Sequence, residues 1–441
     1  MSDLLAKLFP NHLRTLQARA DAALARGGFD HLVIAAGVPR HEFLDDRPAP
    51  FVANPHFKHW LPVTKAPGSW IVYSPGNKPK LIYLQPRDYW HVVPEAPAGY
   101  WVEHFEIAII EEAHAAGAHF PKTLEHCAIV GEDNAALGDA RPNNPESVLN
   151  YLHWHRSYKT DYELAMLRVA SKLGARAHRA AEAAFRAGRS EYDINTAYLN
   201  AVHETENELP YGNIIALNQH GAILHYTDLN RAPPAHADSF LIDAGANFHG
   251  YAADITRTYA AAHAGAFQEL IDAVDAAQRG FVHKVRSGQN YADLHVHAHR
   301  VLAGILREQD FIRMSPESAV ESGVSSAFFP HGLGHMLGLQ VHDVAGFQKD
   351  ETGGSIARPP GHPYLRFTRT LEPRMVTTIE PGIYFIDLLL GELKNKPQAR
   401  DVNWTKVDAF RRYGGIRIED DVVCTEGAPE NLSRDAFTAA A

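Results

Sequence analysis

The composition of the chain changes near residue 160, and this change constrains the fold more than any other feature. Residues 160–187 are rich in Ala, Leu and Arg, with no Pro and one Gly, as is typical of a long helix. Thr160-Asp-Tyr-Glu163 has the form of a capping box that would start this helix. Because 441 residues exceed one compact core of usual size, we predict two domains, residues 1–159 and 160–441.

The first domain is expected to mix helices and strands. Asn11 can cap a helix whose apolar residues keep helical spacing, and Gly27-Gly28 would end it. Short β-prone runs separated by Pro- and Gly-containing stretches then occur at residues 31–35, 70–73, 81–84, 101–105 and 127–130. This order predicts an α/β N-terminal domain.

The second domain is expected to contain both helices and β-prone runs. Ser190-Glu-Tyr-Asp193 can start a second helix, and further helical spacing occurs over residues 266–285 and 291–306. The β-prone runs lie at residues 212–217, 239–259, 376–384 and 415–423. The order favours an α+β domain that contains two related halves.

Charge and cysteine content exclude several classes of function. The formal net charge of -10 disfavours a nucleic-acid partner. No stretch reaches the roughly 18 apolar residues needed to cross a bilayer, so no membrane association is expected. Cys127 and Cys424, the only cysteines, lie far apart and form neither a disulfide framework nor a thiolate metal motif. A reducing, cytoplasmic location is expected.

Two aspartates flank a turn in the β-prone run at residues 239–259. Asp243 ends the apolar residues 240–242, and Asp254 begins residues 254–258 after a turn that contains Gly250. Either residue alone would be interpreted as an ordinary turn aspartate. A hairpin would bring both carboxylates together.

A histidine and two glutamates lie in later segments of similar character. His331-Gly-Leu-Gly-His335 places two imidazoles around glycines that let the backbone bend closely past a ligand. Glu380 follows the apolar, β-prone residues 376–379, where an unpaired carboxylate would be costly to bury. Glu419 ends a run whose alternation sends two isoleucines to one face and Arg417 with Glu419 to the other.

Four carboxylates and one imidazole form an oxygen-rich donor set for divalent cations. This set favours Mn²⁺, with Co²⁺ or Zn²⁺ as alternatives. Bridging carboxylates would hold two ions roughly 3.5–4 Å apart with a shared water between them. We therefore expect a site with two divalent metal ions.

The same residues, in this order and spacing, resemble the pita-bread metallopeptidases, which include methionine aminopeptidase, aminopeptidase P and prolidase. Residues 328–338, 341–344 and 380–387 are most similar to Xaa-Pro dipeptidases (prolidases), in particular the bacterial type close to organophosphorus acid anhydrolase. Residues 43–46 and 81–90 resemble the N-terminal domain of that subgroup. The resemblance implies an α/β N-terminal domain followed by an α+β pita-bread catalytic domain.

The resemblance also implies metal-binding and catalytic roles. Asp243 would be a bidentate ligand, Asp254 and Glu419 bridging ligands, and His335 the one nitrogen ligand. Glu380 would be a terminal ligand and the proton acceptor. A metal-bridged hydroxide would then hydrolyse an Xaa-Pro dipeptide and release C-terminal proline.

Substrate contacts follow from the resemblance as well. His225, His331 and His342 match histidines expected to bind the tetrahedral intermediate or the product carboxylate. Arg366 is expected to bind the free carboxylate of the dipeptide, with Arg417 as a second candidate and a surface arginine as the alternative interpretation of Arg366. Two further residues complete the predicted substrate site: Tyr211 as a pocket wall, and Asp45 reaching in from the partner subunit of a homodimer.

Four other functions stay open at this point. Aminopeptidase P shares the metal chemistry but accepts longer peptides. A pita-bread protein without metals could serve as a binding module, and a creatinase-like enzyme would hydrolyse another C–N bond. A side activity on organophosphorus triesters or fluoridates is also expected, because tetrahedral phosphorus resembles the peptide transition state.

The histidines at positions 295, 297 and 299 alternate within a helical segment. His295 and His299 would share one face of that helix, and no matching carboxylate lies nearby in the sequence. We interpret all three as surface histidines with a structural role.

Overall fold

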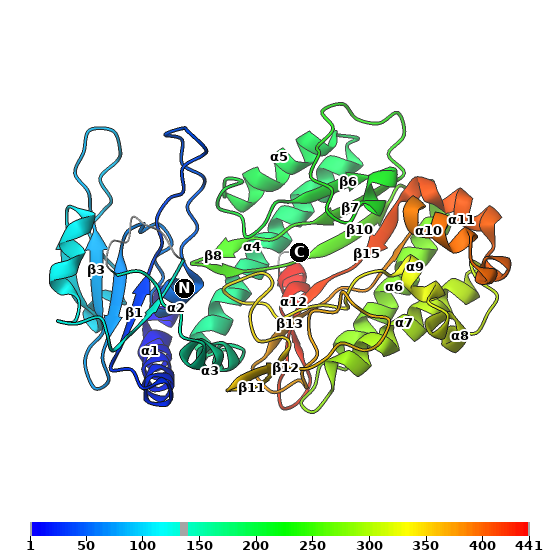
Figure 1. Ribbon diagram of the computed structural model, residues 1–441. Helices are drawn as coiled ribbons and strands as arrows, with labels where there is room; N and C mark the ends of the chain where they lie inside the picture. The colour runs from blue at the N-terminus through cyan, green and yellow to red at the C-terminus, as the bar shows by residue number, and fades with distance from the viewer. Residues whose placement is uncertain (1, 133–139, 440–441) are drawn as a thin grey trace. The chain divides into compact units, whose positions relative to one another are not determined.

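The computed structural model describes residues 2–132 and 140–439, which form two compact units (Figure 1). The N-terminal unit comprises Met1–Met166, His249–Tyr251 and Gln348–Gly354, and the remaining residues form the C-terminal unit. The division falls within helix α4 (Asp161–Arg186). The predicted domain boundary at residue 160 lies at the start of the same helix.

A mixed sheet forms the centre of the N-terminal unit. Its five strands have the order β4-β3-β2-β1-β5. Strand β1 pairs antiparallel with β2 and parallel with β5, while β3 pairs antiparallel with β2 and parallel with β4. The strands are β1 (His31–Ala35), β2 (Trp70–Tyr73), β3 (Lys80–Leu84), β4 (Glu106–Ile110) and β5 (Cys127–Val130). The helices of this unit are α1 (Ser2–Gly27), α2 (Pro55–Trp60) and α3 (Glu146–Arg156), with 3-10 turns η1 (Val102–His104) and η2 (Ala113–His119).

Two predictions for this unit were wrong. Helix α1 begins at Ser2, so Asn11 does not cap it; Leu5 and Phe9 are buried and extend the apolar face, and Pro10 is accommodated inside the helix. The predicted strand at residues 101–105 is instead occupied by the 3-10 turn η1, and the strand follows it at β4.

The predicted capping box at the start of α4 is confirmed. The backbone N–H of Thr160 donates to Oε2 of Glu163 at 2.8 Å, and the N–H of Glu163 donates to Oγ1 of Thr160 at 3.3 Å. Helix α5 (Glu191–Val202) also begins as predicted, because Oγ of Ser190 accepts the N–H of Asp193 at 3.2 Å. Both helix starts follow from side chains that satisfy unpaired N–H groups.

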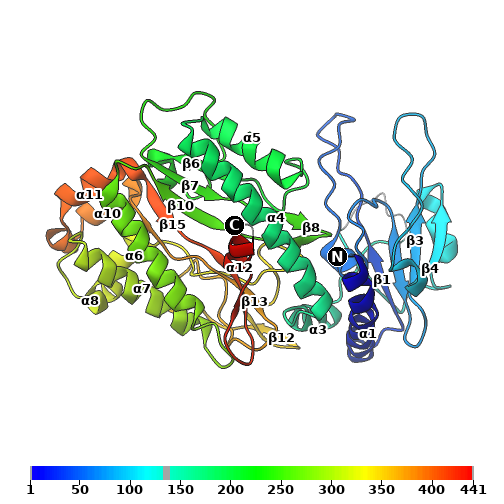
Figure 2. The same cartoon turned by 180° about the vertical axis from the view of Figure 1, so that it is seen from behind.

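Three small antiparallel sheets organise the C-terminal unit. Their orders are β10-β7-β6, β13-β16-β17 and β14-β15. Helices α4 and α5 cover one face of the first sheet, where Phe185 and Tyr198 pack on Phe240 and Ile242 (Figure 2). Leu241, which points to the opposite face, packs on Tyr384. The alternating side chains of β7 therefore separate the helix-covered face from the face that carries Tyr384.

The structure gives the following bounds for the remaining elements. The strands are β6 (Ile214–Leu217), β7 (Ser239–Asp243), β8 (Asn247–Phe248), β9 (Tyr251–Ala252), β10 (Thr256–Ala260), β11 (Gln348–Asp350), β12 (Gly353–Ser355), β13 (Val376–Ile379), β14 (Gly382–Tyr384), β15 (Gly415–Arg417), β16 (Asp420–Val423) and β17 (Glu430–Asn431). The helices are α6 (Gly265–Val282), α7 (Tyr291–Glu308), α8 (Pro316–Glu321), α9 (Val324–Phe328), α10 (Asp387–Lys394), α11 (Trp404–Phe410) and α12 (Leu432–Ala439), with 3-10 turns η4 (Asn218–Ala222), η5 (Pro397–Asp401) and η6 (Arg411–Tyr413). Among the described residues, no helix is both long and apolar enough to cross a bilayer.

Strand pairing brings the ends of the three sheets together. Asp243, the last residue of β7, pairs with Thr256, the first residue of β10. Thr256 also forms an isolated bridge with Glu419, which lies between β15 and β16. Glu380 lies between β13 and β14, the strands that pair with β16 and β15. The topology therefore collects carboxylates from distant segments.

Candidate metal centre

Asp243, Asp254, His335, Glu380 and Glu419 form one cluster, called the acidic centre below. One ligand atom each from Asp254, His335 and Glu419 lie within 4.8 Å of one another. Asp243 is joined to Asp254 through a shared hydrogen-bond partner, and Glu380 lies beside His335. Sequence reasoning selected all five residues, and the structure brings them together.

Tyr211 bridges the two aspartates. Its hydroxyl lies 2.8 Å from Oδ1 of Asp243 and 2.6 Å from Oδ1 of Asp254. A phenol has one hydrogen and donates it to only one acceptor at a time. The second short contact therefore requires a proton on a carboxyl group or a cation between the oxygens.

His335 lies between two carboxylates. Its Nε2 is 3.4 Å from Oδ2 of Asp254 and 3.6 Å from Oε1 of Glu380. Nδ1 lies 3.0 Å from the backbone carbonyl of Met336, which fixes the hydrogen on Nδ1 in the neutral ring. Nε2 is therefore the nitrogen available to a cation. The hydroxyl of Thr378 donates to Oε1 of Glu380 at 3.3 Å.

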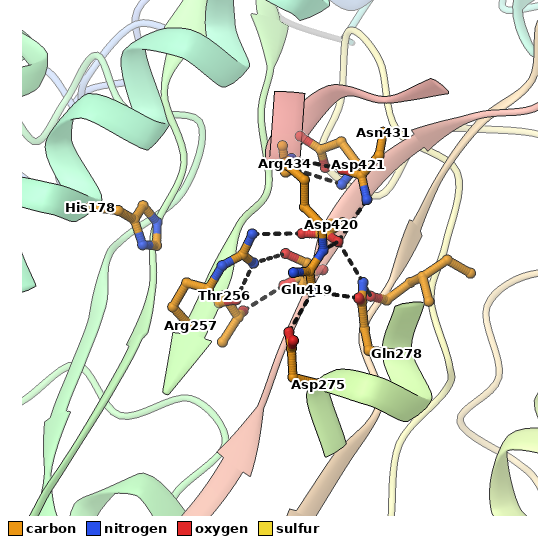
Figure 3. Close-up of polar contacts among 12 residues, drawn as sticks. His178, Thr256, Arg257, Asp275, Gln278, Glu419, Asp420, Asp421, Asn431 and Arg434 are labelled. Atoms are coloured by element: carbon orange, nitrogen blue, oxygen red, sulfur yellow. Dashed lines mark hydrogen bonds and ion pairs between the residues drawn. The ribbon is translucent and has the colours of Figure 1, made fainter. Parts of the chain in front are cut away.

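Glu419 is held by residues at the start of β10 (Figure 3). The hydroxyl of Thr256 donates to Oε2 of Glu419 at 2.6 Å. The N–H of Glu419 donates to the carbonyl of Thr256 at 3.0 Å, and Nη1 of Arg257 donates to the carbonyl of Glu419 at 2.7 Å. These contacts fix the side chain and backbone of Glu419, one carboxylate oxygen of which lies within 4.8 Å of ligand atoms of Asp254 and His335.

Asp420, which follows Glu419 in the sequence, is buried and anchors the start of β16 through its own hydrogen bonds (Figure 3). Its carboxylate accepts hydrogen bonds from Arg257, Gln278, Asn431 and Arg434 at 2.7–2.8 Å. Burial opposes ionisation, but the charges of Arg257 and Arg434 lower the pKa of Asp420. Asp420 is thus compensated by cationic side chains of the protein.

Asp421 supports the other side of the acidic centre. Its two carboxylate oxygens accept the backbone N–H of Asp254 at 3.3 and 3.2 Å, and its own N–H donates to Oγ of Ser433 at 2.9 Å. A side chain from β16 therefore fixes the backbone that carries Asp254.

The electrostatics of the acidic centre fit divalent cations. Burial raises the pKa of Asp243 despite the charge of Arg417, and burial raises the pKa of Glu380 to about 7. Burial followed by the charge of Asp254 raises the pKa of Glu419 well above its ordinary range. Desolvation opposes the charge of His335, but Asp254 and Glu380 raise the pKa of its imidazole to about 9. In the metal-free protein, bound protons therefore offset part of the negative charge of the carboxylates. Bound cations would take over this role.

Arg417 connects the acidic centre to His331. Its Nη2 donates to Oδ2 of Asp243 at 2.6 Å, and its Nη1 donates to the hydroxyl of Tyr384 at 2.9 Å. Nδ1 of His331 lies 2.8 Å from the carbonyl of Gly332, and its Nε2 lies 2.8 Å from the Tyr384 hydroxyl. Nδ1 therefore carries the hydrogen and Tyr384 donates to Nε2. Burial and the charge of Arg417 lower the pKa of His331 to about 3, so its ring is neutral at pH 7.

Three further predicted residues lie around this cluster. The ring of His342 meets that of His335 at 89°, with centroids 4.4 Å apart. Desolvation, the charge of His335 and then that of Arg366 lower the pKa of His342 to about 4. His225 and Arg366 are exposed, and each contributes to the electrostatic environment of His342. Asp45 lies in an exposed turn of the N-terminal unit, where its carboxylate accepts the N–H of Arg47 at 3.2 Å.

Sequence reasoning missed four residues that contact the acidic centre or, in the case of Tyr384, contact its neighbours Arg417 and His331. They are Thr256, Thr378, Tyr384 and Asp421. Tyr384 lies within residues 380–387, which were already singled out, and Asp421 lies two residues after Glu419. Their local sequence gives no sign that their side chains point toward the centre, because that depends on strand register.

Both the N-terminal and the C-terminal part of the chain match models of known protein families. Residues 7–154 match the family model for the Xaa-Pro dipeptidase N-terminal domain. Residues 165–426, which include the whole acidic centre, match the model for metallopeptidase family M24. The chain belongs to metallopeptidase family M24. An M24 metallopeptidase is a metal-dependent hydrolase, and the His, Asp and Glu side chains of the acidic centre fit a divalent metal cofactor.

Relatives of this M24 chain extend over nearly its full length. The chain is 59% identical over 436 residues to the Xaa-Pro dipeptidase of Xanthomonas axonopodis pv. citri (strain 306), covering 99% of both chains. It is 58% identical to the Xaa-Pro dipeptidase of Stenotrophomonas maltophilia (strain K279a), covering 98% of both. The prediction of a protein similar to Xaa-Pro dipeptidases is therefore confirmed.

Solved structures of other proteins resemble the fold of this chain. Proline aminopeptidase P II from Yersinia pestis has a TM-score of 0.71 at 24% identity and covers 98% of this chain and 96% of its own. Aminopeptidase PepP from Pseudomonas aeruginosa has a TM-score of 0.70 at 23% identity, with 98% of each chain covered. The predicted fold class is confirmed: an α/β N-terminal domain and an α+β pita-bread domain.

Proposed function

We propose that this M24 metallopeptidase hydrolyses Xaa-Pro dipeptides and releases C-terminal proline. The proposal rests on the convergence of buried Asp254, His335 and Glu419 with the half-buried carboxylates of Asp243 and Glu380 in the acidic centre. The proline specificity is supported by relatives named Xaa-Pro dipeptidase, which match both the N-terminal and the C-terminal parts of the chain.

We assign Asp243, Asp254, His335, Glu380 and Glu419 as the ligands of two divalent ions. Mn²⁺ suits this oxygen-rich set best, with Co²⁺ or Zn²⁺ as alternatives. Ions bound there would activate water between them and polarise the scissile carbonyl. Four carboxylates also offset the charge of two divalent ions, whereas the metal-free centre holds extra protons.

Glu380 is the residue that we assign to proton transfer. A carboxylate beside the proposed ions can accept a proton and donate it again within one reaction cycle. The carboxylate of Glu380 would accept a proton from the attacking water and pass it to the leaving nitrogen. Proton delivery is needed because an unprotonated amide nitrogen is a poor leaving group.

Three histidines are proposed to stabilise the developing oxyanion. His225 and His342 are exposed beside the acidic centre and can donate a ring N–H to substrate oxygens. His331 is the third member of this set, and the contacts to Gly332 and Tyr384 fix its ring orientation. Reorientation of one contact partner would be required before His331 itself donates to substrate.

Arg366 is the residue that we propose for the substrate carboxylate. Its side chain is exposed, whereas the guanidinium of Arg417 is buried and bonded to Asp243 and Tyr384. The structure thus favours Arg366 over Arg417 for measuring dipeptide length. Tyr211 would contribute its ring as a pocket wall, since its hydroxyl is occupied by the two aspartates. Asp45 is still proposed to reach the substrate site of a partner subunit in a homodimer.

We also propose that the protein forms a homodimer and lies in the cytoplasm. A homodimer is needed for Asp45 of a partner subunit to act, and sedimentation velocity would test for it. A reducing cytoplasm agrees with Cys127 and Cys424, which are both buried free thiols. Cell fractionation would test this location.

The decisive experiment compares Ala-Pro, Ala-Pro-Ala and Ala-Ala as substrates of the Mn²⁺-loaded protein. We expect release of proline from Ala-Pro at a kcat/KM well above that for the other two. A strong preference for Ala-Pro-Ala would favour an aminopeptidase P activity. Creatine hydrolysis without peptide cleavage would favour the creatinase-like alternative.

We also propose a side activity on organophosphorus triesters or fluoridates at the same acidic centre. The tetrahedral phosphorus resembles the transition state of peptide hydrolysis. Asp254→Asn is expected to abolish both reactions together. Phosphotriester hydrolysis retained in that variant would contradict a shared site.

A further inference from the structure

A cluster of three imidazoles, none of which is a proposed ligand of the acidic centre, lies in the C-terminal unit. His295 and His299 lie one turn apart on α7, and His362 lies in the loop that precedes β13. One ring nitrogen from each residue lies within 4.8 Å of the others. Their ring centroids are 4.5–4.7 Å apart, with interplanar angles of 62–88°. The rings thus converge instead of stacking.

This arrangement overturns the interpretation of His295 and His299 as surface residues. Each has only 1% of its surface exposed. Burial lowers the pKa of His295 to about 2 and that of His299 to about 3, so both rings are neutral at pH 7. A neutral imidazole has a lone pair available to a metal ion.

The three rings line a cavity of about 230 Å³. Tyr364, which is 69% exposed, and the exposed Lys396 also line this cavity, so solvent can reach it. His331, whose Nδ1 lies 3.6 Å from Oε2 of Glu380, lines the same cavity, so the cavity that gives a cation access to the imidazoles also reaches the edge of the acidic centre.

We propose that His295, His299 and His362 form a second metal site, which takes a borderline cation of the Zn²⁺ class. Three nitrogen ligands with an open position on the cavity side suit Zn²⁺ better than Mn²⁺, which prefers oxygen. The acidic centre has the opposite donor set, with four carboxylates and one imidazole. The two sites should therefore select different metals.

The contacts around His299 and His362 agree with this assignment. Nδ1 of His299 lies 3.0 Å from Oγ of Ser325, which can accept its N–H while the other ring nitrogen binds the cation. Nε2 of His295 and Nδ1 of His362 lie 3.0 Å apart. Two nitrogen ligands of one tetrahedral Zn²⁺ lie roughly 3.3 Å apart, so only a small separation of these rings is needed.

Binding requires one rearrangement at His295. Its Nδ1 accepts the N–H of Leu333 at 3.2 Å, so its hydrogen lies on Nε2 and points to His362. Zn²⁺ would take the position of that hydrogen, which would move to Nδ1 by exchange with water. The long contact with the Leu333 N–H would then be lost. The ring stays neutral, and no net proton is released.

The test measures both metals in the full-length protein. The chain is first loaded with Mn²⁺, then dialysed against micromolar Zn²⁺ with millimolar Mn²⁺ present, and the bound Zn and Mn are quantified by elemental analysis. We expect about one Zn²⁺ per chain with the Mn²⁺ content unchanged. His362→Ala should lose at least tenfold in Zn²⁺ affinity while it retains Mn²⁺.

His297→Ala is the matched control, because His297 lies on the same helix outside the cluster and packs against Phe281. This variant should bind Zn²⁺ as the unaltered protein does. His299→Gln provides a second disruption of the cluster, checked for folding by circular dichroism. The proposal is overturned if Zn²⁺ uptake is equal in all four proteins, or if each Zn²⁺ bound displaces Mn²⁺. Neither readout requires peptidase activity.

Discussion

The buried guanidinium of Arg417 donates to the half-buried carboxylate of Asp243 at 2.6 Å in an ion pair. The pair joins β15 to β7 and supplies one positive charge to the acidic centre. Breaking a buried pair from one side leaves the other charge without compensation. This relationship gives the first prediction.

Arg417→Met is expected to lower the free energy of unfolding of the metal-free protein by about 3–5 kcal/mol. Urea denaturation measures the change. Adding Asp243→Asn should recover part of the loss, because the unpaired charge is removed. Arg400→Met is the control: Arg400 is exposed and lies 3.6 Å from Asp401, so its loss should change stability by less than about 0.5 kcal/mol. Equal effects of both substitutions would contradict the buried-pair account.

The metal-free protein is predicted to lose stability as the pH rises from 7 to 9. Below about pH 6.5 the buried neutral histidines act in the opposite sense, because the unfolded chain binds protons that they do not. The folded-state pKa of Glu380 is raised to about 7 and that of His335 to about 9, so the folded chain holds protons that the unfolded chain has released. Stability from such groups is present at low pH and is lost as pH passes the folded pKa. One additional bound proton gives a slope of about 1.4 kcal/mol per pH unit.

Urea denaturation across this pH range, in the presence of a chelator, measures the slope. Glu380→Gln should reduce the slope near pH 7, and saturating Mn²⁺ should flatten the decline up to pH 9 because cations replace the protons. A metal-free protein that becomes more stable between pH 7 and 9 would refute this electrostatic description.

Thr256→Val tests the support of Glu419. The substitution keeps the side-chain shape but removes the 2.6 Å hydrogen bond to Oε2 of Glu419. Loss of such an outer contact typically weakens metal binding by about 10–100-fold. Calorimetric titration with Mn²⁺ measures the affinity. Thr368→Val removes another buried hydroxyl, bonded to the carbonyl of Ile356 at 3.1 Å, and should leave Mn²⁺ affinity unchanged.

Arg366→Met is predicted to lower kcat/KM for Ala-Pro by roughly 10–100-fold, as expected for one charge-assisted hydrogen bond. The loss should be much smaller for Ala-Pro amide, which has no terminal carboxylate. Arg300→Met, at an exposed position of α7, is the control and should retain normal kinetics. An equal loss with the dipeptide and the amide would remove Arg366 from carboxylate recognition.

Local signals in the sequence were sufficient for several elements. The capping box at Thr160 and the cap at Ser190 depend on residues three positions apart, and both form as predicted. The aspartate hairpin also forms, because β7 and β10 are close in the chain. At Trp101 and Phe105, however, buried aromatic residues suggested a strand but flank a 3-10 turn. Aromatic side chains can be buried in a core whether the backbone forms a strand or a 3-10 turn.

Contacts between distant segments could not be predicted in the same way. The bridge between Thr256 and Glu419 depends on the register of strands more than 160 residues apart. His362 is likewise 67 residues from His295, so the third imidazole of the cluster was not considered. Without His362, two buried rings on one helix carry no metal-binding signal. In both cases tertiary packing brings a distant residue into contact, and the local sequence does not reveal it.

Metal content measured together with proline release tests the central claim most directly. The chelated protein is reconstituted with Mn²⁺, dialysed and assayed with Ala-Pro, beside Asp254→Asn and Glu419→Gln. We predict about two Mn²⁺ per chain with restored proline release, and loss of both in the two variants. Fewer than one tightly bound ion per chain, with no proline release after reconstitution, would contradict the account and favour a metal-free binding module.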